Sequence, residues 1–313
     1  MNRDIKNILV TGSSGTIGTA LCESLLARGY QFTGIDIHHN KWNDQIDRLT
    51  IISDLRKANF HTVLKKDFDL IIHLAANARV YDLVRRPKLA RDNLLMVFNV
   101  LEFARANNIK RLIFASSREV YGNSDNACRK ENEVSISSCE SPYSATKLGG
   151  EALFHSYSYC YDMVPVILRF SNVYGKYDDS NRVVPIFMQR AMNHKDLIVF
   201  GEQKILDFTY IDDCVNGIVR VIEKFDQVRG NTFNIASGKG TSIMQVADII
   251  KRKTGSNSRI IIRGNRTGEV TNFIADITKA ERLLGYNPKI NIQAGVKRSL
   301  EWYRELNKQT SIR

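Results

Sequence analysis

One stretch decides the fold of this chain: Val10-Thr11-Gly12-Ser13-Ser14-Gly15-Thr16-Ile17-Gly18. It follows a short apolar run, Ile5–Val10, and leads into a helix-length amphipathic segment, Thr16–Arg28. Each glycine has its own use at this spacing, because the first permits a tight turn, the second lets the backbone approach a pyrophosphate, and the third allows close packing of helix against strand. The helix N-terminus would hold the anion. The stretch therefore predicts a dinucleotide-binding strand–turn–helix unit.

The second predicted strand, Gln31–Asp36, ends in an acidic residue 18 positions after Gly18. A carboxylate at this place accepts hydrogen bonds from the adenosine ribose and repels a 2′-phosphate, which favours NAD over NADP. The next predicted strand ends at Asp54-Leu55, which the same geometry would place near the adenine. Three side chains that could weaken the exclusion of NADP follow Asp36: His38, His39 and Lys41.

The first half of the chain alternates strand-like runs with helix-length segments such as Lys88–Asn107. Strands rich in Ile, Val and Leu that alternate with helices indicate a parallel sheet covered on both faces. We therefore predict an α/β fold with a Rossmann-like, doubly wound parallel sheet. Its further strands are predicted at Leu49–Asp54, Asp69–Leu74, Arg111–Ser116 and Pro165–Phe170.

After Phe170 the pattern loosens into shorter elements, which we interpret as a smaller mixed α/β lobe that caps the mouth of the sheet. We expect residues 1–170 to form the NAD-binding domain and residues 171–313 the substrate lobe, with parts of 205–236 returning to the main sheet. Strands are predicted at Leu197–Phe200, Phe208–Ile211, Thr232–Ile235 and Arg259–Ile262. Helices are predicted at Asp212–Phe225, Ser242–Thr254, Ile277–Leu284 and Ile292–Asn307.

The composition is that of a globular protein, with 43% hydrophobic residues and 45 Lys and Arg against 33 Asp and Glu, a formal charge of +12. Such a charge suits either nucleic acid or a solvated surface with sites for anionic small molecules. The basic residues are scattered and form no nucleic-acid motif, which favours the second reading. No His, Cys or carboxylate cluster has metal-site spacing, so no catalytic metal is expected.

The location is predicted from cysteine usage and from apolar runs. Five widely spaced cysteines without a C-x-x-C pair indicate no disulfide framework, and a reducing cytoplasm is the simplest location. Residues 1–6 contain no leader-like apolar region, and no apolar run is long enough to span a bilayer. We therefore expect a cytoplasmic protein that neither enters a membrane nor binds nucleic acid.

A tyrosine and a lysine stand four residues apart at Tyr143 and Lys147, on a segment that reads as a helix. Residues at this spacing share a helix face, so the ammonium group can lie beside the phenol. A nearby cation stabilises a phenolate, and the tyrosine could then remove a proton from a substrate hydroxyl near neutral pH. Further support comes from Ser116-Ser117, which end a predicted strand at the sheet edge where open α/β folds bind ligands.

Taken together, these motifs resemble the extended short-chain dehydrogenase/reductases, specifically the NAD-dependent nucleotide-sugar epimerase/dehydratase family that includes UDP-glucose 4-epimerases. The resemblance covers nearly the whole chain. It rests on residues 11–18, His73-Leu74-Ala75-Ala76, Ser116-Ser117 before Val120-Tyr121-Gly122, Tyr143 with Lys147, Arg169-Phe170-Ser171-Asn172-Val173-Tyr174-Gly175, Asp207-Phe208-Thr209-Tyr210-Ile211 and Arg266-Thr267-Gly268-Glu269.

The resemblance implies tightly held NAD and a nucleoside diphosphate sugar, which we expect to be UDP-linked. Tyr143 matches the family base, Lys147 the residue that binds the nicotinamide ribose and lowers the tyrosine pKa, and Ser117 the hydroxyl that hydrogen-bonds the reacting sugar oxygen. The candidate cofactor-binding residues are Gly12, Gly15, Thr16, Ile17, Gly18, Asp36, Asp54, Leu55, Leu74, Ala75, Ala76, Asn93, Tyr143 and Lys147. The candidate substrate-binding residues are Asn172, Arg182, Val184, Lys204 and Arg266, with Arg182–Pro185 expected to be a loop along the nucleotide.

The sequence departs from the family pattern at two positions. Ala78 stands where many epimerases have a lysine, although Arg79 is adjacent. Leu206 stands where the family often has an arginine, so one diphosphate contact is missing unless Lys204 or Arg263 supplies it. His73, which lies on an apolar predicted strand, is expected to be a packed core residue.

The reaction branch depends on Glu119, which we also count as a candidate catalytic residue. Simple 4-epimerases of the family commonly have a small or neutral residue there, whereas dehydratases and decarboxylases often have Glu, which in dehydratases takes the proton from carbon 5. The dTDP-glucose dehydratases also have an Asp acid where this chain has Arg118, and an arginine cannot donate that proton at neutral pH. We place a UDP-hexose 4-epimerase first and a dehydratase second, and a third reading pairs Glu119 merely with Arg118 or Lys147.

Two further expectations concern partners. A non-catalytic protein that binds NAD or RNA is a competing hypothesis, although Ser117, Tyr143 and Lys147 argue for chemistry. The resemblance also implies a homodimer through two helices per subunit, here Lys88–Asn107 and Tyr143–Tyr161. The second helix carries apolar residues that core packing alone could also explain: Leu148, Leu153, Phe154, Tyr157 and Tyr161.

Overall fold

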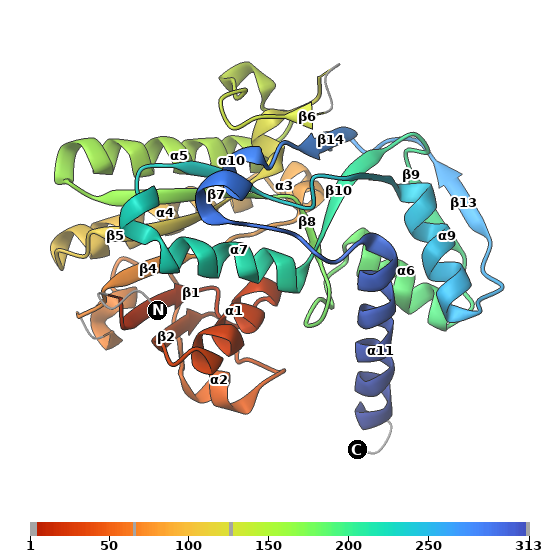
Figure 1. Ribbon diagram of the computed structural model, residues 1–313, viewed down its shortest axis with the longest axis horizontal. Coiled ribbons are helices and arrows are strands. Elements are labelled where there is room, and N and C mark those ends of the chain that lie inside the picture. Colours follow the sequence, from red (N-terminus) through yellow and green to blue (C-terminus); the bar gives the residue numbers. More distant parts are fainter. Residues whose placement is uncertain (1–4, 65–66, 125–127, 311–313) are drawn as a thin grey trace.

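The computed structural model describes residues 5–64, 67–124 and 128–310. Residues 1–4, on which part of the expectation of a missing leader depended, lie outside this range. The main sheet is a seven-stranded parallel sheet of order β11-β7-β5-β4-β1-β2-β3, which confirms the predicted fold class (Figure 1). Its strands are β1 (Asn7–Thr11), β2 (Gln31–Asp36), β3 (Thr50–Ile52), β4 (Leu70–His73), β5 (Arg111–Ser117), β7 (Val164–Phe170) and β11 (Thr232–Ile235).

Helices cover both faces of this sheet, as a buried parallel sheet requires. In Figure 1, α4 (Lys88–Ala106) and α5 (Pro142–Tyr161) lie on one side of the strands, and α1 (Thr16–Ala27) and α7 (Ile211–Glu223) lie on the other. The alternation of side chains along β1 produces two cores, because Ile8 and Val10 belong to one buried cluster and Leu9 to the other.

One strand of the second half, β11, returns to the main sheet. β11 pairs in parallel with β7, from Thr232 opposite Ile167 to Ile235 opposite Phe170. Helix α7, which precedes it, packs against α1 beside the glycine-rich turn. The assignment of 1–170 and 171–313 to two domains stays a prediction.

The rest of the second half forms a smaller mixed sheet of order β12-β10-β14-β6, to which β8 adds by pairing with β10. Strand β10 spans Ile205–Tyr210, three residues earlier than the predicted start, because Ile205–Asp207 pair with two neighbouring strands. The other strands are β6 (Cys128–Arg129), β8 (Asn172–Tyr174), β12 (Gly240–Ser242) and β14 (Asn272–Ala275), and a separate pair joins β9 (Leu197–Phe200) to β13 (Ile260–Arg263).

All four predicted helices of this half are present, with ends shifted by at most three residues: α7, α9 (Ile243–Thr254), α10 (Thr278–Leu284) and α11 (Ile292–Thr310). One prediction is wrong. Arg182–Pro185 is not a loop, since Arg182 is the N-cap of α6 (Val183–Met192) and Pro185 lies in its first turn. Proline is tolerated there because the first helical N–H groups have no intrahelical partner. The shorter helices are α2 (Asp44–Arg48), α3 (Val80–Arg85) and α8 (Phe225–Val228).

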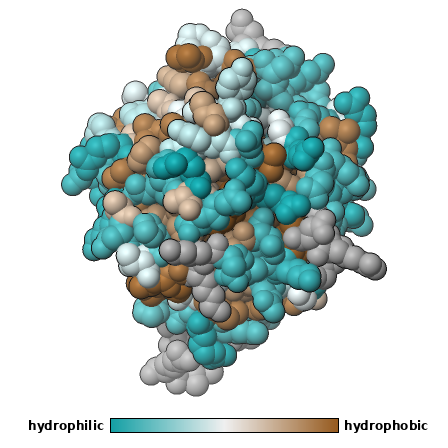
Figure 2. Space-filling model, turned by 90° about the vertical axis from the view of Figure 1, so that its left-hand side faces the viewer, coloured by the Kyte–Doolittle hydropathy of each residue, from teal (hydrophilic) through white to brown (hydrophobic). Residues whose placement is uncertain are grey.

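The surface reflects the scattered charge. Figure 2, which looks at the left-hand end of the molecule in Figure 1, shows hydrophilic residues over most of the face with hydrophobic ones dispersed among them. Within the described residues, no helix has the length and apolar content needed to cross a membrane.

Candidate active site

The glycine-rich turn between β1 and α1 has the close packing that its sequence predicts. Gly12 has φ +74°, and a Cβ there would lie 2.8 Å from the Ala75 backbone nitrogen. A Cβ on Gly18 would lie 2.0 Å from the Gly12 carbonyl oxygen. A larger residue at Gly12 would therefore clash with the loop after β4, and one at Gly18 would push α1 away from the turn.

The N-terminus of α1 is open to an anion. Its N-cap, Gly15, supplies no side-chain hydrogen bond, and a Cβ on Gly15 would approach Gly12 O only to 3.4 Å. The Ser14 hydroxyl is buried without a partner among the described residues, and such a group needs a ligand or water. Asp36 ends β2 beside the turn, where Oδ2 accepts a hydrogen bond from Ser14 N at 3.0 Å and Oδ1 from His38 N at 3.0 Å. These residues fit the pyrophosphate and ribose of NAD.

Three other candidate cofactor residues are engaged within the protein. The Asp54 carboxylate binds Arg56 at 2.7 Å, and this arginine holds the pKa of Asp54 below its usual range. Leu55 is buried, and its carbonyl oxygen accepts a hydrogen bond from Asn99 Nδ2 at 2.7 Å. The Asn93 carboxamide accepts from Asn77 N at 2.8 Å, so in this structure it fixes the loop after β4.

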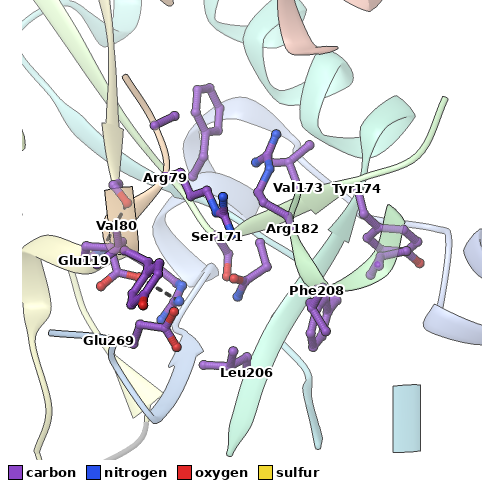
Figure 3. Close-up of a pocket in the computed structure, with 18 of the residues that line it drawn as sticks. Arg79, Val80, Glu119, Ser171, Val173, Tyr174, Arg182, Leu206, Phe208 and Glu269 are labelled. Carbon is purple, nitrogen blue, oxygen red and sulfur yellow. Dashed lines mark hydrogen bonds and ion pairs between the residues drawn. The ribbon is translucent and has the colours of Figure 1, made fainter. Parts of the chain in front are cut away.

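The fold brings most of the remaining candidates to one cavity of about 490 Å³ at the carboxyl end of the main sheet. Figure 3 shows Leu206 and Phe208 of β10 in its wall, with Glu119 and Glu269 on one side and Tyr174 on the opposite side. The lining includes the candidates Ile17, Leu74, Ala76, Ser117, Glu119, Tyr143, Lys147, Asn172, Arg182, Val184, Lys204 and Arg266. Gly12, Gly15, Thr16, Gly18, Asp36, Asp54, Leu55, Ala75 and Asn93 do not line it.

The Ser117, Tyr143 and Lys147 side chains meet in this cavity. Tyr143 lies in the first turn of α5, which Ser141 and Ser144 close with a capping box. Ser117 ends β5 and hydrogen-bonds Tyr143, which lowers the tyrosine pKa, but burial raises that pKa more strongly, to about 12. The Lys147 Nζ donates to Ala115 O at 2.7 Å and lies 5.8 Å from the centre of the Tyr143 ring.

The expected lowering of the Tyr143 pKa by Lys147 stays a prediction. The lysine ammonium is directed at a backbone carbonyl, and burial reduces its own pKa to about 8. The cations that act on the Tyr143 phenol across the cavity are Arg182 and Arg118, while Glu119 opposes them.

Glu119 forms an ion pair with Arg118, one of the two partners suggested in the third interpretation of the sequence. Its carboxylate lies 2.7 Å from the Arg118 guanidinium, and both side chains are more than nine-tenths buried. Burial raises the Glu119 pKa, and the Arg118 charge opposes that rise. The pair lines the same cavity wall as Tyr143, so a pairing role and a chemical role remain compatible.

All five candidate substrate residues line the cavity, and all except Val184 have polar side chains. Lys204 Nζ lies 2.6 Å from Glu269, whereas Arg263 is exposed and does not line the cavity, so of the two suggested replacements only Lys204 is in place. The Arg266 guanidinium lies between two aromatic rings, 3.9 Å from the centre of Phe200 and 5.0 Å from that of Tyr81. Asn172 Nδ2 donates to Asp207 O at 3.0 Å, and Arg182 Nε to Ser180 Oγ at 3.0 Å.

Several residues that line the cavity were not selected from the sequence: Tyr81, Phe187, Arg190 and Phe200. They belong to short elements whose apolar residues read as ordinary packing. His73, by contrast, is the packed core residue that was expected, since it is 1% exposed and burial reduces its pKa to about 3. Among the residues that the structure describes, no three His, Cys, Asp or Glu side chains gather where they could hold a metal ion.

Comparison with known proteins decides the family. The model of the NAD dependent epimerase/dehydratase family matches residues 8–236, which is more than half of the chain. The chain belongs to this family. It is an NAD-dependent enzyme, which removes the hypothesis of a non-catalytic protein.

The members of the epimerase/dehydratase family that resemble this chain include a putative UDP-glucose 4-epimerase of Methanocaldococcus jannaschii, 32% identical over 96% of this chain and 99% of the relative. Two solved structures have the same fold with a TM-score of 0.88 and 29% identity each, and each alignment covers 96% of this chain and 99% of the other. One is a UDP-glucose 4-epimerase of Thermotoga maritima with UDP-glucose, and the other is a UDP-glucuronic acid 4-epimerase of Bacillus cereus with UDP-glucuronic acid and NAD.

Proposed function

We propose that the protein is a UDP-hexose 4-epimerase that works by transient oxidation at carbon 4. The observation that carries the proposal is that Ser117, Tyr143 and Lys147 line one cavity together with several further cationic side chains. The similar proteins described above are named as 4-epimerases of UDP-glucose or UDP-glucuronic acid, which supports the choice of a UDP-sugar and of carbon 4. The cavity is lined by seven cationic side chains and three carboxylates, a balance that suits a diphosphate: Arg79, Arg118, Lys147, Arg182, Arg190, Lys204 and Arg266 against Glu119, Asp178 and Glu269.

The proposed chemistry assigns one proton transfer to Tyr143. Its phenolate would take the proton of the carbon 4 hydroxyl, and Ser117 would hold the same oxygen by a hydrogen bond. Bound NAD⁺ supplies a hydride acceptor and a cationic ring, and this positive charge would favour the phenolate. After the keto sugar has rotated, the return of the hydride to the other face of carbon 4 and of the proton from Tyr143 to the oxygen would restore the alcohol, so no net oxidation would result.

A panel of nucleotide sugars tests the proposed reaction. We expect incubation with UDP-glucose, UDP-N-acetylglucosamine, UDP-glucuronate or dTDP-glucose to give, for at least one, an isobaric product inverted at carbon 4. Product mass and proton NMR identify it. Loss of water, about 18 mass units by the stoichiometry of acid–base elimination, would replace the epimerase by a dehydratase. No dinucleotide in the purified protein, together with no measurable NAD binding, would contradict both.

The dehydratase is the second candidate, and the buried carboxyl of Glu119 in the cavity wall is the observation that favours it. The raised pKa of Glu119 suits a group that exchanges protons, while the ion pair with Arg118 limits how far that pKa rises. In this candidate mechanism Glu119 would remove the proton from carbon 5.

The variant Glu119→Gln separates the two candidates through the pH dependence of kcat. The Glu119 charge raises the Tyr143 pKa, so its removal lowers that pKa and increases the phenolate fraction at a given pH. For an epimerase we therefore expect the low-pH limb of kcat to move to lower pH with turnover retained. For a dehydratase we expect turnover to fall by roughly 10²–10⁴-fold at every pH.

We also propose that the protein forms a homodimer through α4 and α5. The apolar residues that pointed to this helix pair on α5 are mainly core residues, since Phe154 and Tyr157 are buried and only Tyr161 of the five is exposed. The exposed apolar stripe lies instead on α4, where Leu94, Leu95 and Phe98 are 37%, 37% and 46% exposed. Such a stripe on one helix suits a second copy of the chain.

For the dimer we expect Phe98→Asp to give a monomer, because it places a charge in the centre of the stripe. Light scattering at micromolar concentration measures the mass. Ile136→Asp is the matched control, since Ile136 is 84% exposed and lies outside α4 and α5. A wild-type protein that is already monomeric would refute the proposed dimer.

A further inference from the structure

Three segments that are far apart in the sequence meet beside the glycine-rich turn: the loop after β2, the loop before α6, and α11. Each contributes one aromatic ring, and the rings contact one another in pairs. The centroids lie 5.2 Å apart for Trp42 and Trp302, 5.7 Å for Tyr177 and Trp302, and 6.1 Å for Trp42 and Tyr177. These distances are those of favourable tilted or edge-to-face pairs. The chain has two tryptophans, and both are in this aromatic cluster.

Tyr177 connects the cluster to the start of α1. Its carbonyl oxygen accepts a hydrogen bond from Thr16 Oγ1 at 3.1 Å, and its hydroxyl donates to Glu23 Oε1 at 2.7 Å. Thr16 is the first residue of α1, whose N-terminus fits the pyrophosphate of NAD. Tyr177 has φ +64°, a conformation that residues other than glycine rarely adopt and that persists only where the surroundings hold it.

Trp42 is tied to the same helix from the other side. Asn40 Nδ2 donates to Thr19 Oγ1 of α1 at 2.9 Å, and Asn40 Oδ1 accepts from Trp42 N at 3.0 Å. An ion pair between Lys41 and Asp179 joins the two loops directly. Trp302 of α11 closes the cluster, and its neighbour Tyr303 donates a hydrogen bond to Asp178 O.

We propose that Trp42, Tyr177 and Trp302 are positioning residues for NAD. By packing together they hold the loop before α6 against the N-terminus of α1, so that a bound dinucleotide is enclosed and leaves slowly. The hydrogen bond from Thr16 and the exposed Lys41–Asp179 ion pair each contribute little, so we assign the larger part of the attachment of this loop to the three rings. This role concerns the cofactor alone and does not depend on which sugar the enzyme takes.

The rate of NADH release tests the proposal. Protein loaded with NADH is mixed with excess NAD⁺, and the loss of NADH fluorescence gives the rate constant. For Trp302→Ala we expect release roughly 10- to 100-fold faster, because Trp302 loses its ring pairs with both Trp42 and Tyr177 and changes in affinity act mainly on dissociation. Trp302→Phe keeps a ring in place and should stay within about threefold of wild type, on the same pair energies.

Trp42→Ala gives the same test from a surface loop, and it decides the question if Trp302→Ala does not fold. The double variant should release NADH no faster than the more affected single variant, because both changes break one unit. Arg304→Ala, an exposed residue on the same helix, is the matched control and should leave the rate unchanged. Trp42→Phe leaves Trp302 as the only tryptophan of the chain. We expect the fluorescence emission of Trp302 in this variant to change when NAD binds.

The proposal is overturned if folded Trp302→Ala and Trp42→Ala release NADH at the wild-type rate, even if they melt at a lower temperature. That result would leave the cluster a merely structural role. The measurement uses no sugar nucleotide, so a negative substrate panel and a negative release experiment remain distinguishable.

Discussion

Replacement of Tyr143 by phenylalanine is expected to lower kcat by roughly 10²–10⁴-fold, the range found when an enzyme loses a general acid–base group. The phenyl ring keeps the packing of the first turn of α5, so the change removes one oxygen and little else. Tyr143 is the tyrosine that the structure places within hydrogen-bonding reach of Ser117 at the sheet edge. No other lining tyrosine has that partner among the contacts described.

The measurement is the turnover of Tyr143→Phe with the nucleotide sugar that the panel identifies, at several pH values. NAD binding and thermal unfolding should stay close to wild type. The matched control is Tyr157→Phe on the same helix, whose hydroxyl donates to Glu102 at 2.6 Å away from the cavity. Loss of turnover in the control, or turnover of Tyr143→Phe within tenfold of wild type, would refute the assigned role.

Arg169→Met is expected to reduce the free energy of unfolding by about 3–5 kcal/mol, the cost of removing one member of a buried ion pair. Arg169 on β7 holds Glu151 on α5 through two hydrogen bonds, of 2.9 Å and 2.7 Å, and both side chains are at least 94% buried. Glu151 also accepts a hydrogen bond from Ser116 Oγ at 2.5 Å. Without the arginine, the carboxylate would remain buried with a single neutral partner.

Urea unfolding of the NAD-free protein measures this change. In Glu151→Leu/Arg169→Met most of the stability should return, because replacing a whole buried pair by apolar groups is often neutral. Arg259→Met removes the exposed pair with Asp196 and should have little effect. A loss below about 1 kcal/mol for Arg169→Met would show that water or a structural adjustment compensates the Glu151 charge.

Several features of the site could not be predicted from sequence because they depend on what burial does to charges. The spacing of Tyr143 and Lys147 predicted a shared helix face, and both residues line the cavity, but it did not predict that the lysine ammonium donates to the Ala115 carbonyl. The sequence left three roles open for Glu119, and the tertiary structure supplied its partner, Arg118. Of the two residues suggested as replacements for the arginine missing at position 206, the fold brings only Lys204 to the cavity.

The sequence by itself determined the architecture, the cofactor and the enzyme family, because these depend on local pattern: glycine spacing, the alternation of strands and helices, and motifs within a few residues of one another. It did not determine the short strands β6, β8, β12 and β14, which have two to four residues each and too few positions for a period to show. Such strands form only because distant partners complete their hydrogen bonds.

Only the tertiary structure decided which side chains share the cavity, which are buried, and which charges meet. It also brought Trp42, Tyr177 and Trp302 together from three segments whose own sequences carry no common signal. The physical reason is that the hydrogen bonds of helices and turns join residues only a few positions apart in the sequence. Desolvation, ion pairing and ring packing depend instead on contacts between residues tens to hundreds of positions apart.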